Sequence, residues 1–141
     1  MLQAQPSPRI FVVDDESVIA LSLATILCRS GFDAKPFTEP LVALRAARSE
    51  APDLLISDVV MPGLSGIDLA IQIQEYCPKC KVLLFSGQAA TADLLERARV
   101  NGNAFELLLK PVHPQDLLNK IREVTRDMPP LTSFPVATSG K

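Results

Sequence analysis

Short runs of apolar residues alternate along the chain with longer stretches in which apolar residues recur every three or four positions. The short runs are typical of buried strands, and the recurrence is typical of helices that pack on one face. The pattern predicts five strands, over residues 10–13, 33–37, 54–57, 81–85 and 104–109. A helix is expected after each strand, so that five strand and helix units alternate strictly.

Residues that favour caps or turns mark the ends of these helices. Gly31 is expected to end the first helix as its C′ residue, Thr38 to cap the second, Ser65 the third and Thr91 the fourth, while Pro114 opens the last. The residues expected to face the core are Ile19, Leu23, Ile26 and Leu27; Leu41, Leu44 and Ala47; Ile67, Ala70, Ile71 and Gln74; Leu94, Leu95 and Ala98; and Leu117, Leu118, Ile121 and Val124.

Strands that are apolar nearly throughout and alternate with helices are typical of a parallel sheet covered by helices on both faces. The sequence therefore predicts a doubly wound α/β domain with right-handed crossovers. The domain is expected to span residues 9–127, after a leader at 1–8. A flexible tail is expected at 128–141, where Pro, Ser and Thr accumulate without periodicity.

The composition agrees with a single globular domain and narrows the class of partner. The 141 residues are enough for one core, and 48% of them are apolar while 21% are charged. A net charge of −2 provides no basic surface for nucleic acid. The sequence also lacks a signal-peptide h-region and any run of about 18 apolar residues. We expect a cytoplasmic protein that binds neither nucleic acid nor a membrane.

Cys77 and Cys80 have the C-x-x-C spacing of redox dithiols and of half a zinc site. The odd total of three cysteines argues against a disulfide framework. A structural zinc site uses four ligands, and the remaining candidates, Cys28 and His113, are distant in the sequence. Two incidental loop thiols are the simpler interpretation, and His113 is expected to cap the last helix or lie on the surface.

Five polar residues stand where predicted strands end. Asp14 and Asp15 follow the first strand, Asp58 the third, Ser86 the fourth and Lys110 the fifth. An Asp at the start of a turn commonly caps backbone N–H groups, and that interpretation fits any one of these acids alone. In open α/β sheets, however, ligands bind outside the carboxyl ends of the strands. The convergence of carboxylates, a hydroxyl and an ammonium group at that edge predicts a functional site.

Three carboxylates in one crevice require a cation. At about 4 Å and an effective dielectric constant near 20, each like-charge pair costs on the order of 4 kcal/mol. Lys110 supplies one positive charge, and Mg²⁺ is suited to supply the rest because it prefers carboxylates, carbonyls, waters and phosphate oxygens. The predicted ligands are the carboxylates of Asp14, Asp15 and Asp58 and the backbone carbonyl of Val60.

A metal ion and an ammonium group directed at one point are suited to a phosphoryl group, whose oxygens carry negative charge during transfer. A carboxylate can act as the nucleophile and form an aspartyl phosphate. Asp58 is central among the predicted strands and is the expected nucleophile. Ser86 is expected to donate its hydroxyl to one phosphoryl oxygen, and Lys110 to pair with another.

Over about residues 8–127 these features resemble the receiver domains of two-component response regulators. The resemblance rests on Asp14-Asp15, on Asp58 within Asp-Val-Val-Met-Pro-Gly-Leu-Ser-Gly, on Ser86-Gly87 and on Lys110-Pro111. It implies a flavodoxin-like (βα)5 fold with sheet order 2-1-3-4-5 and Mg²⁺-dependent phosphorylation of Asp58. A sensor histidine kinase or a histidine phosphotransfer protein would be the donor. The resemblance also implies a cis peptide bond between Lys110 and Pro111.

Leu107 and Val60 are two of the positions at which the sequence departs from the family pattern. Receivers commonly have Tyr or Phe three residues before the lysine, where this chain has Leu107, and Phe105 lies two residues upstream. The aromatic form of the output switch is therefore in question, and Phe105 is expected to pack in the core. Receivers also often have a polar residue two positions after the phosphoacceptor, where this chain has Val60. A branched apolar group there is expected to hinder the attacking water and to prolong the phosphorylated state.

Three classes of function are compatible with a carboxylate site of this kind. A signalling switch would pass the phosphorylation of Asp58 to a downstream protein, without multiple-turnover catalysis, as a monomer or weak homodimer. A haloacid-dehalogenase-type phosphatase would need an acid where Val60 stands, and usually a cap domain. A binding module would keep the fold without phosphorylation. Flavin or nucleotide binding is disfavoured because no glycine-rich loop follows the first strand.

Overall fold

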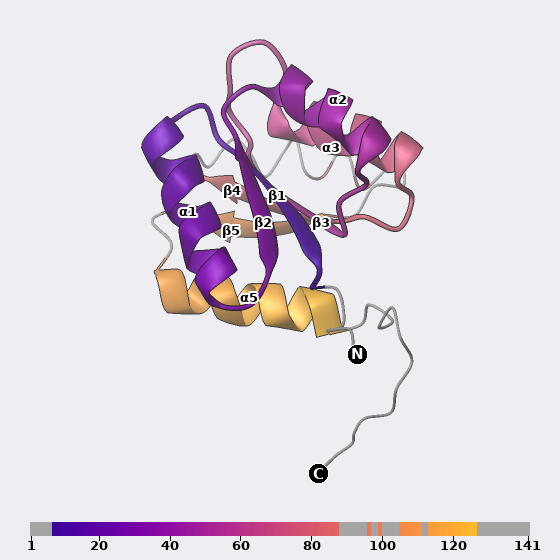
Figure 1. Ribbon diagram of the computed structural model, residues 1–141. Coiled ribbons are helices and arrows are strands. Elements are labelled where there is room, and N and C mark those ends of the chain that lie inside the picture. Colours follow the sequence, from indigo (N-terminus) through magenta and orange to yellow (C-terminus); the bar gives the residue numbers. More distant parts are fainter. Residues whose placement is uncertain (1–6, 88–95, 97–98, 100–104, 111–112, 127–141) are drawn as a thin grey trace, which may run out of the picture.

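The computed structural model describes residues 7–87, 96, 99, 105–110 and 113–126 (Figure 1). Its elements follow the predicted alternation of strands and helices. They are β1 (Arg9–Val13), α1 (Ser17–Arg29), β2 (Asp33–Phe37), α2 (Pro40–Ser49), β3 (Leu54–Asp58), α3 (Gly66–Tyr76), β4 (Lys81–Ser86), β5 (Glu106–Leu109) and α5 (Pro114–Arg126). The expected helix after Thr91, the Lys110–Pro111 bond, the tail and most of the leader lie outside the described residues.

The five strands form one parallel sheet in the order β2-β1-β3-β4-β5, as the resemblance implied. β3 therefore lies in the centre, between β1 and β4. Val13 is in register with Ser57, and Asp58 with Phe85. This register brings the carboxyl ends of β1, β3 and β4 to one edge of the sheet.

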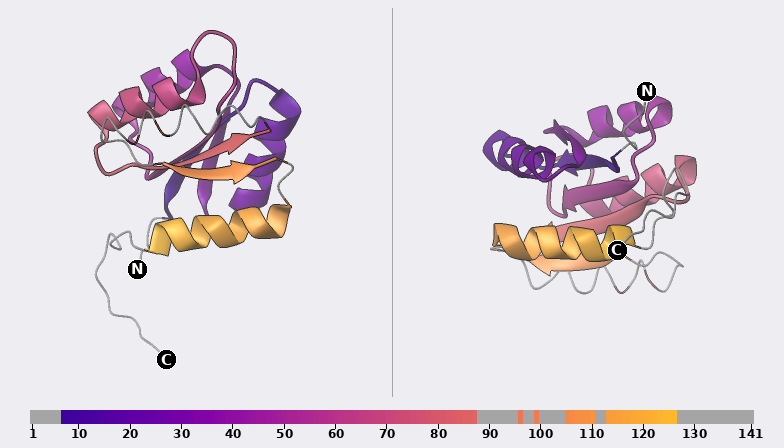
Figure 2. Two further views of the ribbon diagram at one scale, coloured as in Figure 1. Left: turned by 180° about the vertical axis from the view of Figure 1, so that it is seen from behind. Right: turned by 60° about the horizontal axis from the view of Figure 1, so that its bottom comes forward.

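Two helical layers cover the sheet, with α2 and α3 on one face and α1 and α5 on the other (Figures 1 and 2). Alternate residues of β1 divide between the two faces. Phe11 and Val13 belong to the apolar cluster under α2 and α3, whereas Ile10 and Val12 belong to the cluster under α1 and α5. Each fully buried side chain of this size contributes about 1.5–3 kcal/mol by leaving water, so the core fixes both layers on the sheet.

The end of α1 matches its prediction. Gly31 has a φ of 99°, a backbone conformation that residues with a Cβ rarely adopt. The Gly31 N–H donates to the Cys28 carbonyl at 3.2 Å, and the Phe32 N–H donates to the Leu27 carbonyl at 3.0 Å. These two bonds satisfy the last carbonyls of α1 and form a Schellman motif.

The predicted start of α2 was one residue too early. The N-cap is Glu39, without a side-chain cap bond, and not Thr38. Pro40 occupies the first turn as expected, because its fixed φ suits a helix and its missing N–H has no intrahelical role there. The position of the proline therefore decides where α2 begins.

The predicted core face of α3 was rotated. Ser65 caps this helix as expected, and its Oγ accepts a hydrogen bond from the Asp68 N–H at 3.1 Å. The buried residues, however, include Leu69 and Ile73, both 0% exposed, whereas Ile71 and Gln74 are half-buried. The reason is that Gly66 faces β3, which directs the residues three, four and seven positions later toward the sheet.

The last helix agrees with the sequence. Leu117 and Ile121 are buried, and Leu118 and Val124 are partly buried against the same cluster. His113 caps α5, since its Nδ1 accepts a 3.2 Å hydrogen bond from the Gln115 N–H. This is the capping role expected for the histidine.

Candidate functional site

The predicted site residues lie at the carboxyl edge of the sheet. Asp14 directly follows β1, Asp58 and Ser86 are the last residues of β3 and β4, and Lys110 directly follows β5. The Lys110 N–H donates to the Ser86 carbonyl at 2.8 Å and joins the ends of two neighbouring strands. The parallel order of the sheet thus gathers side chains that are far apart in the sequence.

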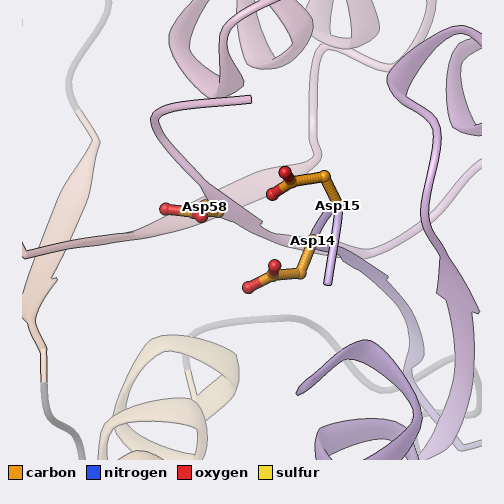
Figure 3. Close-up of side chains that lie close together, drawn as sticks. All are labelled: Asp14, Asp15 and Asp58. Atoms are coloured by element: carbon orange, nitrogen blue, oxygen red, sulfur yellow. The ribbon is translucent and has the colours of Figure 1, made fainter. Parts of the chain in front are cut away.

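Asp14, Asp15 and Asp58 form a compact carboxylate cluster (Figure 3). One carboxylate oxygen from each lies within 4.8 Å of the others. Asp14 and Asp58 are buried, with 1% and 8% of their surface exposed, whereas Asp15 is exposed. Two of the three charges are thus largely removed from water, which makes compensation by a cation necessary.

Lys110 supplies part of that compensation. Its Nζ lies 3.2 Å from Asp58 Oδ2 and 3.9 Å from Asp14 Oδ2, and its side chain is half-buried. Asp58 is therefore paired with an ammonium group and does not act mainly as a turn cap. One ammonium charge still leaves the three carboxylates with an excess of negative charge.

Asp14 shows where this excess is concentrated. Its Oδ1 accepts a hydrogen bond from the Glu16 N–H at 2.9 Å, but its buried Oδ2 has no hydrogen-bond partner among the described residues. Burial raises the pKa of the Asp14 carboxyl above its ordinary value, and the negative charges of Asp58 and Asp15 act in the same direction. The Glu16 N–H and Lys110 oppose this rise in pKa without cancelling it.

The donor set fits Mg²⁺. Hard divalent cations prefer oxygen ligands, and an unsatisfied buried carboxylate oxygen beside two other carboxylates is a suitable ligand set. Among the described residues this is the one group of three or more acidic, histidine or cysteine side chains placed to hold a metal ion. Asp14, Asp15 and Asp58 would hold the ion.

Val60 and Ser86 are placed near this cluster by the backbone. Ser86 is buried at the end of β4. Val60 follows β3 by two residues, and its side chain is 52% exposed. The distances in the structure bring Asp14, Asp15, Asp58 and Lys110 together. The expected contacts of the Ser86 hydroxyl and the Val60 carbonyl with a ligand stay predictions.

Sequence reasoning missed two residues that contact the Asp58 backbone. The Ser57 hydroxyl donates to the Asp58 carbonyl at 2.9 Å, and Gly66 packs against the same carbonyl. The sequence did contain a signal for Gly66: glycine is a poor helix former, so a glycine at the first position of a helix suggests that another part of the backbone approaches closely there. No comparable signal marked Ser57.

The cysteine pair is part of the core. Cys77 and Cys80 are 7% and 2% exposed, and both are free thiols. Burial raises the pKa of Cys77, and burial together with the neighbouring Cys77 raises the pKa of Cys80 to about 12. Thiols that stay protonated are poor nucleophiles and poor metal ligands, which favours the interpretation of incidental thiols.

A sequence profile for the response regulator receiver domain matches residues 10–122. The chain belongs to this family. Its receiver fold is shared with a response regulator receiver domain protein from Clostridium thermocellum, whose crystal structure is similar at a TM-score of 0.75 and 31% identity. That likeness covers 84% of this chain and 94% of the other.

Curated relatives of this receiver are response regulators. The DNA-binding response regulator MtrA of Mycobacterium tuberculosis is 29% identical over 114 residues, which are 81% of this chain and 49% of MtrA. The transcriptional regulatory protein CreB of Escherichia coli is 29% identical over 117 residues, which are 83% of this chain and 50% of CreB. The chain thus spans about half the length of these relatives.

Leu107 occupies the position in β5 where receivers commonly have an aromatic residue, and Phe105 directly precedes the strand. Leu107 and Phe105 are both partly buried against the cluster under α2 and α3. Phe105 therefore has the packing role that was expected of it. Leu109, on the same face of the strand as Leu107, is 64% exposed.

Proposed function

We propose that this protein is a phosphorylation-dependent signalling switch that accepts a phosphoryl group on Asp58. The observation that carries the proposal is the pairing of the Asp58 carboxylate with Lys110 at 3.2 Å inside the three-carboxylate cluster of a receiver domain. The orphaned Asp14 Oδ2 supports a requirement for Mg²⁺. Asp58 stands at the end of the central strand, at the carboxyl edge of the sheet.

The chemistry follows from the groups at the sheet edge. An Asp58 carboxylate oxygen attacks the phosphorus of a phosphorylated histidine, so that the O–P bond forms as the N–P bond breaks and the imidazole leaves. Lys110 Nζ pairs with one phosphoryl oxygen, and the Ser86 hydroxyl donates to another. Asp14, Asp15 and Asp58 would hold Mg²⁺, which would supply positive charge to balance the phosphoryl oxygens.

The donor is a sensor histidine kinase or a histidine phosphotransfer protein, and the output is a protein interaction. Phosphorylation replaces the single negative charge of the Asp58 carboxylate with a phosphoryl group of about −1.5 to −2, at the edge where Ser86 ends β4 and Lys110 follows β5. The face of β5 and α5 then changes for a downstream protein. The chain works in the cytoplasm as a monomer or weak homodimer, contacts no nucleic acid or membrane itself, and is not a multiple-turnover enzyme.

The net charge and the residue at position 60 support this class of function. The net charge of −2 gives no electrostatic attraction to nucleic acid. Among the described residues, no helix is long and apolar enough to span a membrane. Val60 occupies the position where a dehalogenase-type phosphatase would need its second acid, which favours a switch over such an enzyme.

The test is phosphorylation of the intact protein by acetyl phosphate with Mg²⁺, followed by mass spectrometry of the labelled peptide. We expect one phosphoryl group on Asp58, none in Asp58→Asn, and none when EDTA replaces Mg²⁺. Asp68→Asn is the matched control, because Asp68 is an exposed acid at the start of α3 outside the carboxylate cluster. Folded wild-type protein that stays unlabelled, or that is labelled on another residue, would contradict the proposal.

A further inference from the structure

Ser57 places a buried hydroxyl directly before the phosphoacceptor. It is 0% exposed, and its Oγ donates a 2.9 Å hydrogen bond to the backbone carbonyl of Asp58. The ladder between β1 and β3 ends one residue earlier, at the pair of Val13 and Ser57. Buried backbone carbonyls require a donor. The Ser57 side chain provides one at the point where that ladder stops.

Gly66 holds the same carbonyl from the side of α3. A Cβ at this position would overlap the Asp58 carbonyl oxygen and lie 2.9 Å from Ser57 Oγ, so a larger residue would displace the backbone. The Gly66 N–H also donates to the Val59 carbonyl at 2.9 Å. Ser57 and Gly66 thus fix two successive carbonyls, those of Asp58 and Val59, at the start of the loop that leads to α3.

Packing alone does not explain a serine at position 57. Leu55 and Val59, the residues two positions before and after Ser57, both belong to the apolar cluster under α2 and α3. An unpaired hydroxyl in such a layer costs about 1–3 kcal/mol, and an apolar residue would avoid that cost. The hydrogen bond to the Asp58 carbonyl accounts for a polar side chain at this place.

We propose that Ser57 and Gly66 form a backbone clamp that positions Asp58 and the following loop for phosphoryl transfer. The clamp holds the peptide plane between Asp58 and Val59, which sets the direction of the Asp58 carboxylate and the place of the Val60 carbonyl. Ser57 is a positioning residue, because its hydroxyl bonds to the Asp58 backbone carbonyl and it acts through Asp58. The inference rests on the proposed function of Asp58. It adds two residues, Ser57 and Gly66, that hold the Asp58 backbone and are not part of the carboxylate cluster.

The test compares Ser57→Ala with Ser65→Ala. Both changes remove one serine hydroxyl that bonds to backbone near the start of α3, but only Ser57 reaches the Asp58 carbonyl. The maximal rate of Asp58 labelling by acetyl phosphate is measured at saturating Mg²⁺, and Mg²⁺ affinity is measured separately by titration calorimetry. We expect Ser57→Ala to lower the maximal rate about tenfold and to weaken Mg²⁺ binding several-fold, and Ser65→Ala to change neither.

The results separate the clamp from the proposed function. Equal rates and equal Mg²⁺ affinities in wild type and Ser57→Ala would overturn the clamp. So would equal losses in Ser57→Ala and Ser65→Ala, because a general loosening of α3 would then explain both. If wild type itself is not labelled on Asp58, the proposed function fails; the calorimetric comparison of Ser57→Ala with wild type then decides the clamp.

Discussion

At the scale of single residues, Asp14 and Asp15 show how neighbours of the same type acquire different properties. Asp14 is buried with an orphaned oxygen, whereas Asp15 is exposed. The sequence predicted both as metal ligands but gave no means to tell which acid is buried. That difference depends on how the chain leaves β1, where the Asp14 N–H donates to the Phe37 carbonyl at 3.0 Å. Asp14 therefore carries most of the electrostatic cost of the carboxylate cluster.

Asp14→Asn is expected to make the metal-free protein more stable at pH 7, by about 1 kcal/mol or more, because it removes a buried charge beside Asp58. Since the folded pKa of Asp14 is raised, the folded state holds its proton to higher pH than the unfolded state, and the Asp14 contribution to stability falls as pH rises through that pKa. The advantage of the variant should therefore shrink toward acid pH. Urea unfolding with EDTA at several pH values measures it.

The matched control for this charge effect is Asp15→Asn. Its carboxylate is exposed, so its removal should change metal-free stability by less than about 0.5 kcal/mol. Mg²⁺ should reverse the order of stability between wild type and Asp14→Asn, because wild type alone retains the full ligand set. A variant at position 14 that is less stable than wild type in EDTA at pH 7 would show that burial of this charge is already compensated.

Val60 is expected to prolong the phosphorylated state. Val60 is 52% exposed just beyond Asp58, and its branched apolar side chain offers no hydrogen bond to orient an attacking water. Val60→Asn adds such a group and should accelerate loss of phosphate several-fold. Release of labelled phosphate from the purified phosphoprotein measures the rate. Val42→Asn, a similar change on exposed α2, is the control, and equal rates in all three proteins would refute the expectation.

At the scale of elements, the strands were easier to predict than the helix faces. Apolar runs located β1, β3 and β4 to within one residue of the described bounds, because buried strands leave a short continuous signal. β2 was a weaker candidate, since its residues alternate between exposed and at least partly buried. The sheet order followed from the family resemblance and not from the pattern. The predicted face of α3 was partly right, since Ile67 and Ala70 are buried as expected, whereas Leu69 and Ile73 take the places predicted for Ile71 and Gln74. Only the approach of Gly66 to Asp58 selects the observed face.

The observed face of α3 predicts a difference between two isoleucines. Ile73 is 0% exposed between α3 and the sheet, so Ile73→Ala should lower the free energy of unfolding by about 2–5 kcal/mol. Ile71 is half-buried, and the same truncation there should cost less than half as much. Urea unfolding of both variants measures the two losses. Equal losses would favour the originally predicted stripe over the observed one.

At the scale of the whole molecule, the site joins strands that the fold brings together. Asp14 and Asp15 follow β1, Asp58 ends β3 and Lys110 follows β5. The charged groups of the site therefore come from three strands and interact at one edge of the sheet. The sequence predicted this convergence because parallel strands share one carboxyl edge. It did not reveal the clamp, since one serine inside an apolar strand carries no periodic signal, and its bond depends on where the neighbouring ladder ends.

A cation held by Asp14, Asp15 and Asp58 would stabilise the folded state, because the unfolded chain does not hold the three carboxylates together. We expect Mg²⁺ at a hundred times its Kd to raise the free energy of unfolding by about 2.7 kcal/mol, as measured by urea unfolding. Asp14→Asn should lose most of this gain, while Asp53→Asn, which changes an acid that accepts from the Arg9 N–H at the opposite end of β1, should retain it. An equal gain in wild type and Asp14→Asn would mean that Mg²⁺ acts on the surface in general and not through the cluster at the sheet edge.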